Sequence, residues 1–367
     1  MKILLFRSNN FFDSRVNKYY NYFVRSGIDY TIVGWDRKGE GLHREHYDFF
    51  RYRAGEAEGG LKAIRNHFKW MRFVYCYLKS HKEVTTIHAC DLNTAFPAAI
   101  FKALYKRNVT LLFDACDWYS SNFANYKFLK WLFGAMEQFS CKLSDELIIC
   151  EPERKSQIQF ELKKEPLVLP NIPEIEMSHI FEIQDKYKFD NRNPTIAYMG
   201  GFANGRFLLE LLSLAETEPI NLLIAGSGNI EVTEKCEDLA KLDNVRYFGR
   251  VNMVDGLNME NAADVIYAMY CKTNPNHVYA APNKYYEAML LGKPLITTKG
   301  TIPGDKVEKF GTGWAVEEDI EEMRLLFNHL TKVDIEEKGK KALELWKNHY
   351  QFVIRDFFDN KYSKVIK

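Results

Sequence analysis

The sequence alternates short β-rich runs with longer stretches of helical apolar spacing, and this pattern occurs twice along the chain. In the first half the strand-like runs lie at 2–7, 29–35, 84–89, 109–115 and 146–150, and helix-like stretches lie near 14–26, 61–80, 92–106 and 125–143. Strands that alternate with helices at this interval pair in parallel, and helices cover both faces of their sheet. The first half is therefore predicted to be a doubly wound α/β domain.

A proline-containing stretch separates the two series of strands. Pro170, Pro173 and Pro194 punctuate it, and strand-like runs then resume at 195–200, 221–226, 245–249, 264–269 and 294–297. We predict an N-terminal domain at 1–172, a C-terminal domain at 173–340, and an aromatic, amphipathic tail at 341–367 that packs back towards the first domain. Two Rossmann-like domains of this kind are expected to face each other across a cleft at the carboxyl ends of their strands.

Charge and cysteine content narrow the function classes. The 367 residues contain 50 Lys and Arg against 49 Asp and Glu, so no overall positive charge suggests a nucleic-acid partner. The two halves of the sequence nevertheless differ in net charge, which is +7 over residues 1–170 and −6 over residues 171–367. Seven cysteines without CxxC spacing argue against a zinc cluster and for a reducing compartment. Because the N-terminal apolar run is too short for a signal peptide, we expect a cytoplasmic protein.

Two glycine-containing segments follow strands of the second half. Gly200 and Gly201 end one run, and Arg206 follows where a helix is expected to open; Gly226 and Gly228 end the next run. Glycines let backbone N–H groups approach an anion closely, and a helix N-terminus adds partial positive charge. Each segment fits a phosphate-binding loop, and each also fits a tight strand–helix turn.

The segment at 281–298 is the most specific. Asn283 lies where a helix should start, and Lys284 and Glu287 are three residues apart on one face of its first turns. A cation at that place can contact diphosphate oxygens, and a carboxylate one turn later can accept both hydrogens of a ribose diol. The same spacing also fits a surface ion pair.

These motifs together, in this order, resemble the C-terminal domain of GT-B glycosyltransferases. The likeness is to the group 1 family, mostly retaining enzymes that build bacterial lipopolysaccharide and capsule glycans. It implies a hexosyltransferase type of enzyme that moves a sugar from a UDP- or GDP-sugar, bound by the second domain, to a glycan acceptor bound by the first. It also implies that the enzyme uses neither a metal nor a cofactor.

Carried over residue by residue, the resemblance implies that Glu287 binds the ribose and that Gly200 and Gly201 line the diphosphate. Arg206 or Lys284 then supplies the neutralising cation, with Asn283 beside it, and Gly226 and Gly228 border the base. Two positions depart from the family pattern: Tyr279 stands eight residues before Glu287, where a second carboxylate is usual, and Cys116 replaces a histidine after the fourth N-terminal strand.

A group in the first domain could activate the acceptor hydroxyl if the configuration of the sugar is inverted. In a retaining reaction the departing phosphate could take the proton instead, so such a base is not required. Candidates near predicted strand ends or loops are Asp13, His88, Asp91 and Asp117. Each of them also fits a structural role, and Asp13 fits a helix N-cap.

The stretch 61–80 mixes basic and aromatic residues and contains no acidic residue. Arg65, Lys69, Trp70 and Arg72 are predicted to form a face that adsorbs to anionic lipid, which suits a lipid-linked acceptor at the inner side of the plasma membrane. An ordinary helix with a solvated basic face fits the same residues.

Two other functions fit this architecture. One is a nucleotide-sugar epimerase or hydrolase, which needs acid–base groups but no acceptor. The other is a non-catalytic sugar-nucleotide-binding partner in a glycan-assembly complex. Turnover without an acceptor distinguishes the first of these, and binding without any turnover distinguishes the second.

Overall fold

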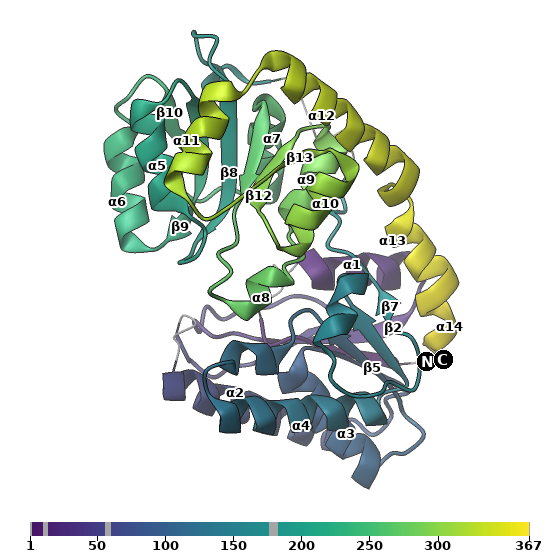
Figure 1. The fold of residues 1–367 in the computed structure, drawn as a ribbon. Coiled ribbons are helices and arrows are strands. Elements are labelled where there is room, and N and C mark those ends of the chain that lie inside the picture. The colour runs from purple at the N-terminus through teal and green to yellow at the C-terminus, as the bar shows by residue number, and fades with distance from the viewer. Residues whose placement is uncertain (1, 10–13, 56–59, 176–182, 367) are drawn as a thin grey trace. The chain divides into compact units, whose positions relative to one another are not determined.

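The computed structural model describes residues 2–9, 14–55, 60–175 and 183–366. The chain forms two compact units (Figure 1): residues 1–170 together with 353–367, and residues 171–352. The second unit thus ends twelve residues later than the sequence suggested, because the helix Lys332–Leu345 runs through residue 340 and, with the turn that follows it, belongs to that unit.

The first unit is built on one parallel sheet in the order β3-β2-β1-β4-β5-β6-β7. Its strands are β1 (Lys2–Phe6), β2 (Asp29–Trp35), β3 (Tyr47–Phe50), β4 (Thr86–Cys90), β5 (Thr110–Ala115), β6 (Glu146–Ile149) and β7 (Leu167–Val168). The five predicted strands are present, and the short edge strands β3 and β7 are additions. Edge strands this short carry little hydrophobic patterning, which is why the sequence did not indicate them.

Helices cover both faces of this sheet. The helices are α1 (Ser14–Arg25), α2 (Gly60–Ser80), α3 (Leu92–Leu104) and α4 (Lys127–Leu143), with short 3₁₀ turns η1 (Tyr119–Phe123) and η2 (Pro152–Gln157). In Figure 1, α2, α3 and α4 run side by side along one face, and the core beneath them includes Trp70, Val74 and Phe101. The opposite face holds α1 and the end of the chain.

The end of the chain completes the first unit's second core. Residues from α13 (Val353–Asp356), the π-helical turn η6 (Phe357–Tyr362) and α14 (Ser363–Val365) pack on α1. Phe357, Phe358 and Tyr362 are almost fully buried. The ring of Phe358 stacks on Tyr22 at 4.8 Å between centroids, and that of Tyr362 lies 5.3 Å from Tyr19.

The second unit repeats the same winding with the strand order β10-β9-β8-β11-β12-β13, again entirely parallel. The strands are β8 (Thr195–Phe202), β9 (Asn221–Gly228), β10 (Val245–Tyr247), β11 (Val265–Ala268), β12 (Leu295–Thr298) and β13 (Gly313–Val316). In both sheets the first strand of the unit lies in the middle, and the winding reverses beside it. The reversal falls between β1 and β4 in the first unit and between β8 and β11 in the second.

The helices of the second unit are α5 (Leu208–Thr217), α6 (Ile230–Leu239), α7 (Met253–Ala262), α8 (Pro275–Val278), α9 (Asn283–Leu291), α10 (Ile302–Phe310), α11 (Ile320–His329) and α12 (Lys332–Leu345), followed by the π-helical turn η5 (Trp346–Tyr350). The helix α9 begins after Pro282 and ends at Gly292, whose φ of 63° suits the left-handed residue that closes a helix. Its middle is buried, so α9 is an inner helix that carries its first turn to the carboxyl edge of the sheet.

Candidate functional site

The reversal of strand order in the second sheet locates its ligand-binding edge. In doubly wound sheets, ligands bind outside the carboxyl ends of the strands where the winding changes direction. Here that point lies between β8, which ends at Phe202, and β11, which ends at Ala268. Arg206 follows β8, Tyr270 follows β11, and Lys284 and Glu287 lie on α9, which packs on β11.

Lys284 lies between two buried carboxyl groups. Its Nζ is 2.5 Å from Oε2 of Glu287 and 2.9 Å from Oε1 of Glu260, which belongs to α7. Both acids are at most 2% exposed. Burial lowers the pKa of Lys284, but the two carboxyl groups outweigh this effect and raise the pKa above its usual value. The sequence placed Lys284 and Glu287 on one helical face, and the structure adds Glu260 as a third member.

Arg206 supplies a second cation at the same edge. Its guanidinium group lies over the ring of Tyr270, 4.1 Å from the centroid, an arrangement that holds the side chain in place. Among the described residues its buried Nη1 has no hydrogen-bond partner. Burial raises the pKa of Tyr198 to about 12, and the charges of Arg206 and Lys284 both act against that rise, so both cations influence this tyrosine. An anion that reaches Nη1 would satisfy a donor that is otherwise left unpaired.

The first turn of α9 adds backbone donors. Asn283 opens the helix after Pro282, and Lys284 follows in the same turn. The first N–H groups of a helix have no partner inside it and carry partial positive charge. Asn283, Lys284 and the helix end therefore suit an anionic group.

The glycines belong to strands and not to the loops predicted for them. Gly200 and Gly201 lie in β8, paired with Gly226 and Ser227 of β9. Gly226 has a φ of 156°, and a Cβ there would lie 2.0 Å from the carbonyl oxygen of Gly200. A Cβ on Gly228 would likewise lie 2.5 Å from the Phe202 oxygen. These two glycines let β8 and β9 approach each other closely and extend side by side to the edge.

The start of α5 also differs from the prediction. Arg206 does not open the helix; α5 begins at Leu208, after Phe207 in a left-handed conformation with φ of 54°. Arg206 thus lies on the connection between β8 and α5, where its side chain turns to Tyr270 and not along a helix.

The first sheet has a polar cluster at its own reversal point. Arg7 follows β1 and forms an ion pair with Asp91, which follows β4. Oδ1 of Asp91 also accepts a hydrogen bond of 3.2 Å from the backbone N–H of Cys116, after β5. The backbone of Asp91 has a φ of 64°, which is costly for a residue with a side chain and is found preferentially at functional positions.

Neighbouring polar groups extend this cluster. The amide of Asn93 donates to Oγ of Ser8 at 2.9 Å, and it lies 3.0 Å from Nδ1 of His67 on α2. Burial and the charge of Arg37 lower the pKa of His67 to about 4, so its ring is neutral near pH 7 and can accept the hydrogen bond from Asn93. Arg7, Asn93 and His67 were not identified from the sequence, because each is a single polar residue without a motif.

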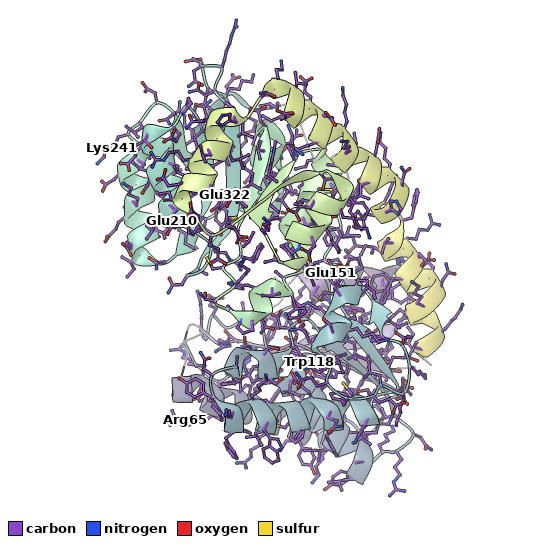
Figure 2. The ribbon with its side chains drawn as sticks, viewed as in Figure 1. Arg65, Trp118, Glu151, Glu210, Lys241 and Glu322 are labelled. Carbon is purple, nitrogen blue, oxygen red and sulfur yellow. The ribbon has the colours of Figure 1, made fainter. Side chains whose placement is uncertain are left out.

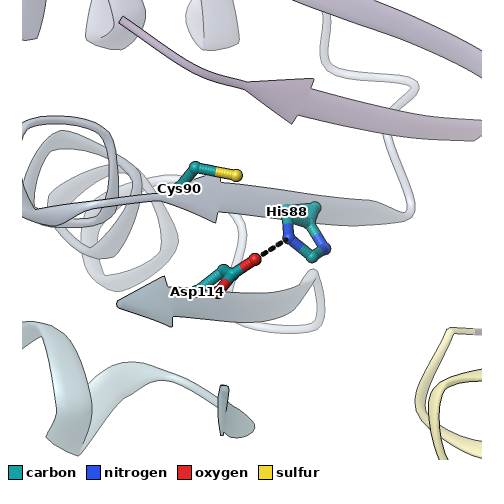
Figure 3. Close-up of side chains that lie close together, drawn as sticks. All are labelled: His88, Cys90 and Asp114. Carbon is teal, nitrogen blue, oxygen red and sulfur yellow. Dashed lines mark ion pairs between the residues drawn. The ribbon is translucent and has the colours of Figure 1, made fainter. Parts of the chain in front are cut away.

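His88 is not available as a base for an acceptor. It lies in the middle of β4 with no exposed surface, and its Nδ1 is 3.0 Å from the Tyr362 hydroxyl. Figure 3 shows its other side facing Asp114, with Nε2 3.5 Å from Oδ2. Burial lowers the pKa of His88 despite the nearby carboxylate, which makes it a neutral core residue.

The other predicted bases have different outcomes. Asp117 forms an ion pair of 3.0 Å with Arg154, and its side chain is 66% exposed. Asp13 lies outside the described residues. Asp91 is the predicted acid that the structure brings to a strand reversal.

His88, Cys90 and Asp114 are also the one group of three metal-ligating side chains found in the described part of the chain (Figure 3). Both carboxylate oxygens of Asp114 already accept hydrogen bonds from other residues. Arg15 donates from Nε to Oδ2 at 2.9 Å and from Nη2 to Oδ1 at 2.6 Å, and the Tyr19 hydroxyl donates to Oδ2 at 2.8 Å. The group is therefore a buried structural network that does not suit a metal ion.

Three of the four residues predicted to form a basic, lipid-facing surface lie at the surface of the protein. Arg65, Lys69 and Arg72 are exposed along α2, and Figure 2 shows Arg65 near the start of that helix. Trp70 is completely buried and stacks on Trp35 with 5.7 Å between ring centroids, so it belongs to the core. Phe68 on α2 is 47% exposed, and the most exposed aromatic residues of this layer lie on α4 and just before it: Tyr126, Phe128 and Trp131 are each at least 65% exposed.

No helix in the described parts of the chain combines the length and the apolar character that crossing a bilayer requires.

Comparison with known proteins gives one family. Residues 193–330 match the family described as "Glycosyl transferases group 1". No curated protein sequence matches the chain significantly. The match confirms the predicted resemblance to this family over these residues.

Similar solved structures cover almost the whole chain. HepE from Anabaena, in complex with UDP and glucose, is 13% identical with a TM-score of 0.70, over 99% of this chain and 100% of that one. An E. coli structure described as trehalose-6-phosphate bound with UDP-2-fluoro glucose is 9% identical, with a TM-score of 0.70, over 100% and 99%. A putative UDP-N-acetylglucosamine 2-epimerase from Listeria monocytogenes is 13% identical, with a TM-score of 0.60, over 97% and 94%. At these identities the likeness concerns the fold, and it confirms two Rossmann-like units of the GT-B type.

Proposed function

We propose that this chain, whose residues 193–330 belong to the group 1 glycosyltransferases, transfers a sugar from a nucleoside-diphosphate sugar to a hydroxyl group of a glycan acceptor. The observation that carries the proposal is the set of charged groups at the reversal point of the second sheet. Arg206, Lys284 and the first turn of α9 offer donors for a diphosphate, and Glu287 offers a carboxylate for the ribose. UDP is the first nucleotide to test, because HepE and the E. coli neighbour are described with UDP or a UDP-sugar.

The reaction breaks the bond between the anomeric carbon and the diphosphate oxygen, whose electron pair leaves with the nucleoside diphosphate. The acceptor oxygen forms the new bond to that carbon and loses its proton. Negative charge grows on the diphosphate as the bond breaks, and fixed cations and helix N–H groups stabilise that charge without further reorganisation. We propose that Arg206 and Lys284 fill the role that a divalent ion has in other enzymes. We also propose that configuration is retained, with the departing phosphate accepting the proton.

The donor assignment is tested by binding. Lys284→Ala and Glu287→Ala should each weaken UDP or GDP binding at least tenfold in isothermal titration calorimetry, because each removes a contact to the diphosphate or ribose. Lys241→Ala is the matched control, since Lys241 is an exposed lysine of the same unit (Figure 2). Wild-type affinity in both donor variants would overturn the assignment, and EDTA should leave wild-type binding unchanged.

The acceptor belongs to the first unit in this proposal. The Arg7–Asp91 pair and the amide of Asn93 provide charged and polar groups for a glycan at the reversal point of that sheet. The epimerase neighbour shares the fold, so the acceptor is also the test that separates the two activities. A transferase releases UDP only when an acceptor is present, whereas an epimerase converts the UDP-sugar alone.

We further propose that the acceptor is lipid-linked and that the layer formed by α2, α3 and α4 contacts an anionic membrane surface. The three helices carry nine Lys and Arg residues, and their one acid, Glu137, is buried. Phe128 and Trp131 are exposed at the start of α4, and the centroids of their rings are 6.0 Å apart. Lys130 stands between them in the sequence. Aromatic rings beside basic side chains match the headgroup region of an anionic bilayer.

Vesicle flotation tests this surface. The double variant Phe128→Ser, Trp131→Ser should lose most of its binding to phosphatidylglycerol vesicles while its melting temperature stays near that of the wild type, since both rings are exposed. Leu325→Ser on α11 is the control, because it removes an equally exposed apolar residue from the second unit. Unchanged flotation of the double variant, or equal binding to neutral vesicles, would contradict the proposal.

A further inference from the structure

Glu260 is a buried acid that no sequence motif indicated. It lies on α7 with no exposed surface, and its Oε1 is 2.9 Å from Nζ of Lys284 on α9. The same ammonium group contacts Oε2 of Glu287. One buried cation therefore lies between two buried acids that come from two different helices.

The charges of this group do not balance if both acids are ionised. Two carboxylates and one ammonium leave a net negative charge in a place shielded from water, which is unfavourable because a buried charge without a partner loses its hydration. Burial, and then the charge of Glu287, raise the pKa of Glu260 to about 8, although Lys284 acts in the opposite direction. At neutral pH Glu260 thus holds a proton, and the three groups together are close to neutral.

Within the described parts of the chain, the acids that act on the pKa of Lys284 are Glu260 and Glu287. The strand β8 contributes Tyr198, whose pKa is raised by burial, although the charges of Arg206 and Lys284 act to lower it. Tyr270, which follows β11, has a pKa that burial raises and that also depends on the charges of Arg206, Lys284 and Glu287. The strand β9, which also packs on α7, has no titratable side chain. The net charge at this place therefore depends on the three groups together with the cation Arg206.

We propose that Glu260 is a positioning residue of the donor site: its neutral carboxyl group holds the Lys284 ammonium beside Glu287 and keeps the three groups free of net negative charge, so that they accept a nucleoside diphosphate. The inference rests on the proposed donor site. When the ribose hydroxyls occupy Glu287, Glu260 remains as a fixed partner for Lys284. Loss of the Glu260 proton adds a negative charge that repels the diphosphate.

The consequence is a coupling between nucleotide binding and a proton. The affinity of the wild-type protein for UDP should fall by up to about tenfold per pH unit above pH 8, because one proton is linked to binding. Calorimetry at pH 8.5 in two buffers of different ionisation enthalpy should show that the protein takes up a fraction of a proton as UDP binds. The absence of proton uptake in the wild type would overturn the proposal without reference to any variant.

Variants separate the neutral and ionised forms. Glu260→Gln keeps a neutral polar group and should bind UDP at pH 7 within about threefold of the wild type, with no extra loss at pH 9. Glu234→Gln, which changes an exposed acid on α6, is the matched control and should keep the wild-type pH profile. Glu260→Asp keeps an ionisable group on a shorter side chain, so it should bind more weakly and still lose affinity at high pH.

The outcomes distinguish this inference from the donor assignment. If the wild type binds neither UDP nor GDP at any pH, the donor assignment fails. If Lys284→Ala weakens binding but Glu260→Gln keeps the alkaline loss, the role of Glu260 alone is refuted. A flat profile in Glu260→Gln together with proton uptake in the wild type supports both.

Discussion

At the scale of single residues, close packing requires a glycine in one place and leaves room for a larger residue in another. Gly226 is required because a Cβ would strike the carbonyl oxygen of Gly200, whereas Gly201 has no atom within 4 Å of the place where its Cβ would be. Both glycines come from segments that suggested an anion-binding loop. Their surroundings show that a glycine motif after a strand can reflect close pairing of two strands.

This contrast gives a stability prediction. Gly226→Ala should lower the free energy of unfolding by about 3 kcal/mol, because it combines an unfavourable φ with a collision against backbone. Gly201→Ala should change it by no more than about 0.5 kcal/mol. Urea unfolding followed by circular dichroism measures both, and equal effects of the two substitutions would contradict the explanation.

The candidate site shows which residues a sequence can reveal. Lys284 and Glu287 were found because three-residue spacing at a helix start places two side chains on one face. Glu260 was missed because α7 itself was missed: its ten residues include Gly256 and Asn258, and they show little apolar periodicity. Gly256 is there for packing, since a Cβ would lie 1.5 Å from the sulfur of Met199. Glu260 reaches Lys284 through tertiary packing, and such a contact leaves no pattern in the local sequence.

At the scale of elements, most central strands and long helices followed from apolar periodicity, within a few residues of their observed ends. The short strands β3, β7 and β13 and the helices α7 and α10 did not, because their places depend on the sheet they pack against. The segment 353–366 is the clearest case of an element defined by its partner. It contains the turn η6, and the aromatic residues of this turn complete a core on α1.

The C-terminal segment should therefore stabilise the first unit. Tyr362→Ala should cost about 3–5 kcal/mol through the loss of a fully buried ring, and Tyr362→Phe about 1 kcal/mol through the loss of its contact to His88. Phe352→Ala, which changes an exposed ring just before the segment, serves as the control. Calorimetry that resolves the two transitions measures these effects, and an unchanged transition of the first unit in Tyr362→Ala would refute the role given to the segment.

At the scale of the whole molecule, two units with the same winding have opposite charge and different polar clusters. Both clusters were predictable in position, since strand order fixes where a doubly wound sheet binds ligands. Their composition was predictable only where a motif existed, which was the case in the second unit and not in the first. With residues 353–367 counted in the first unit, the net charges are +9 and −8, which agrees with units that meet different partners.

Calorimetry should resolve this difference between the units. A nucleotide that binds the second unit stabilises its native state by about 2.7 kcal/mol at a concentration one hundred times the dissociation constant. We expect UDP to raise the melting temperature of the transition assigned to residues 171–352 and to leave the other transition less affected. An equal shift of both transitions, or a shift only in the first unit, would contradict the placement of the donor.

The return of residues 353–367 to the first unit has a consequence for how the protein is made. The ribosome synthesises these residues long after α1, which they cover. Until they emerge, the nascent chain exposes the rings of Tyr19, Tyr22 and Phe23, the kind of surface that chaperones bind. A chain that stops after the second unit would lack this cover and would be a ready substrate for degradation.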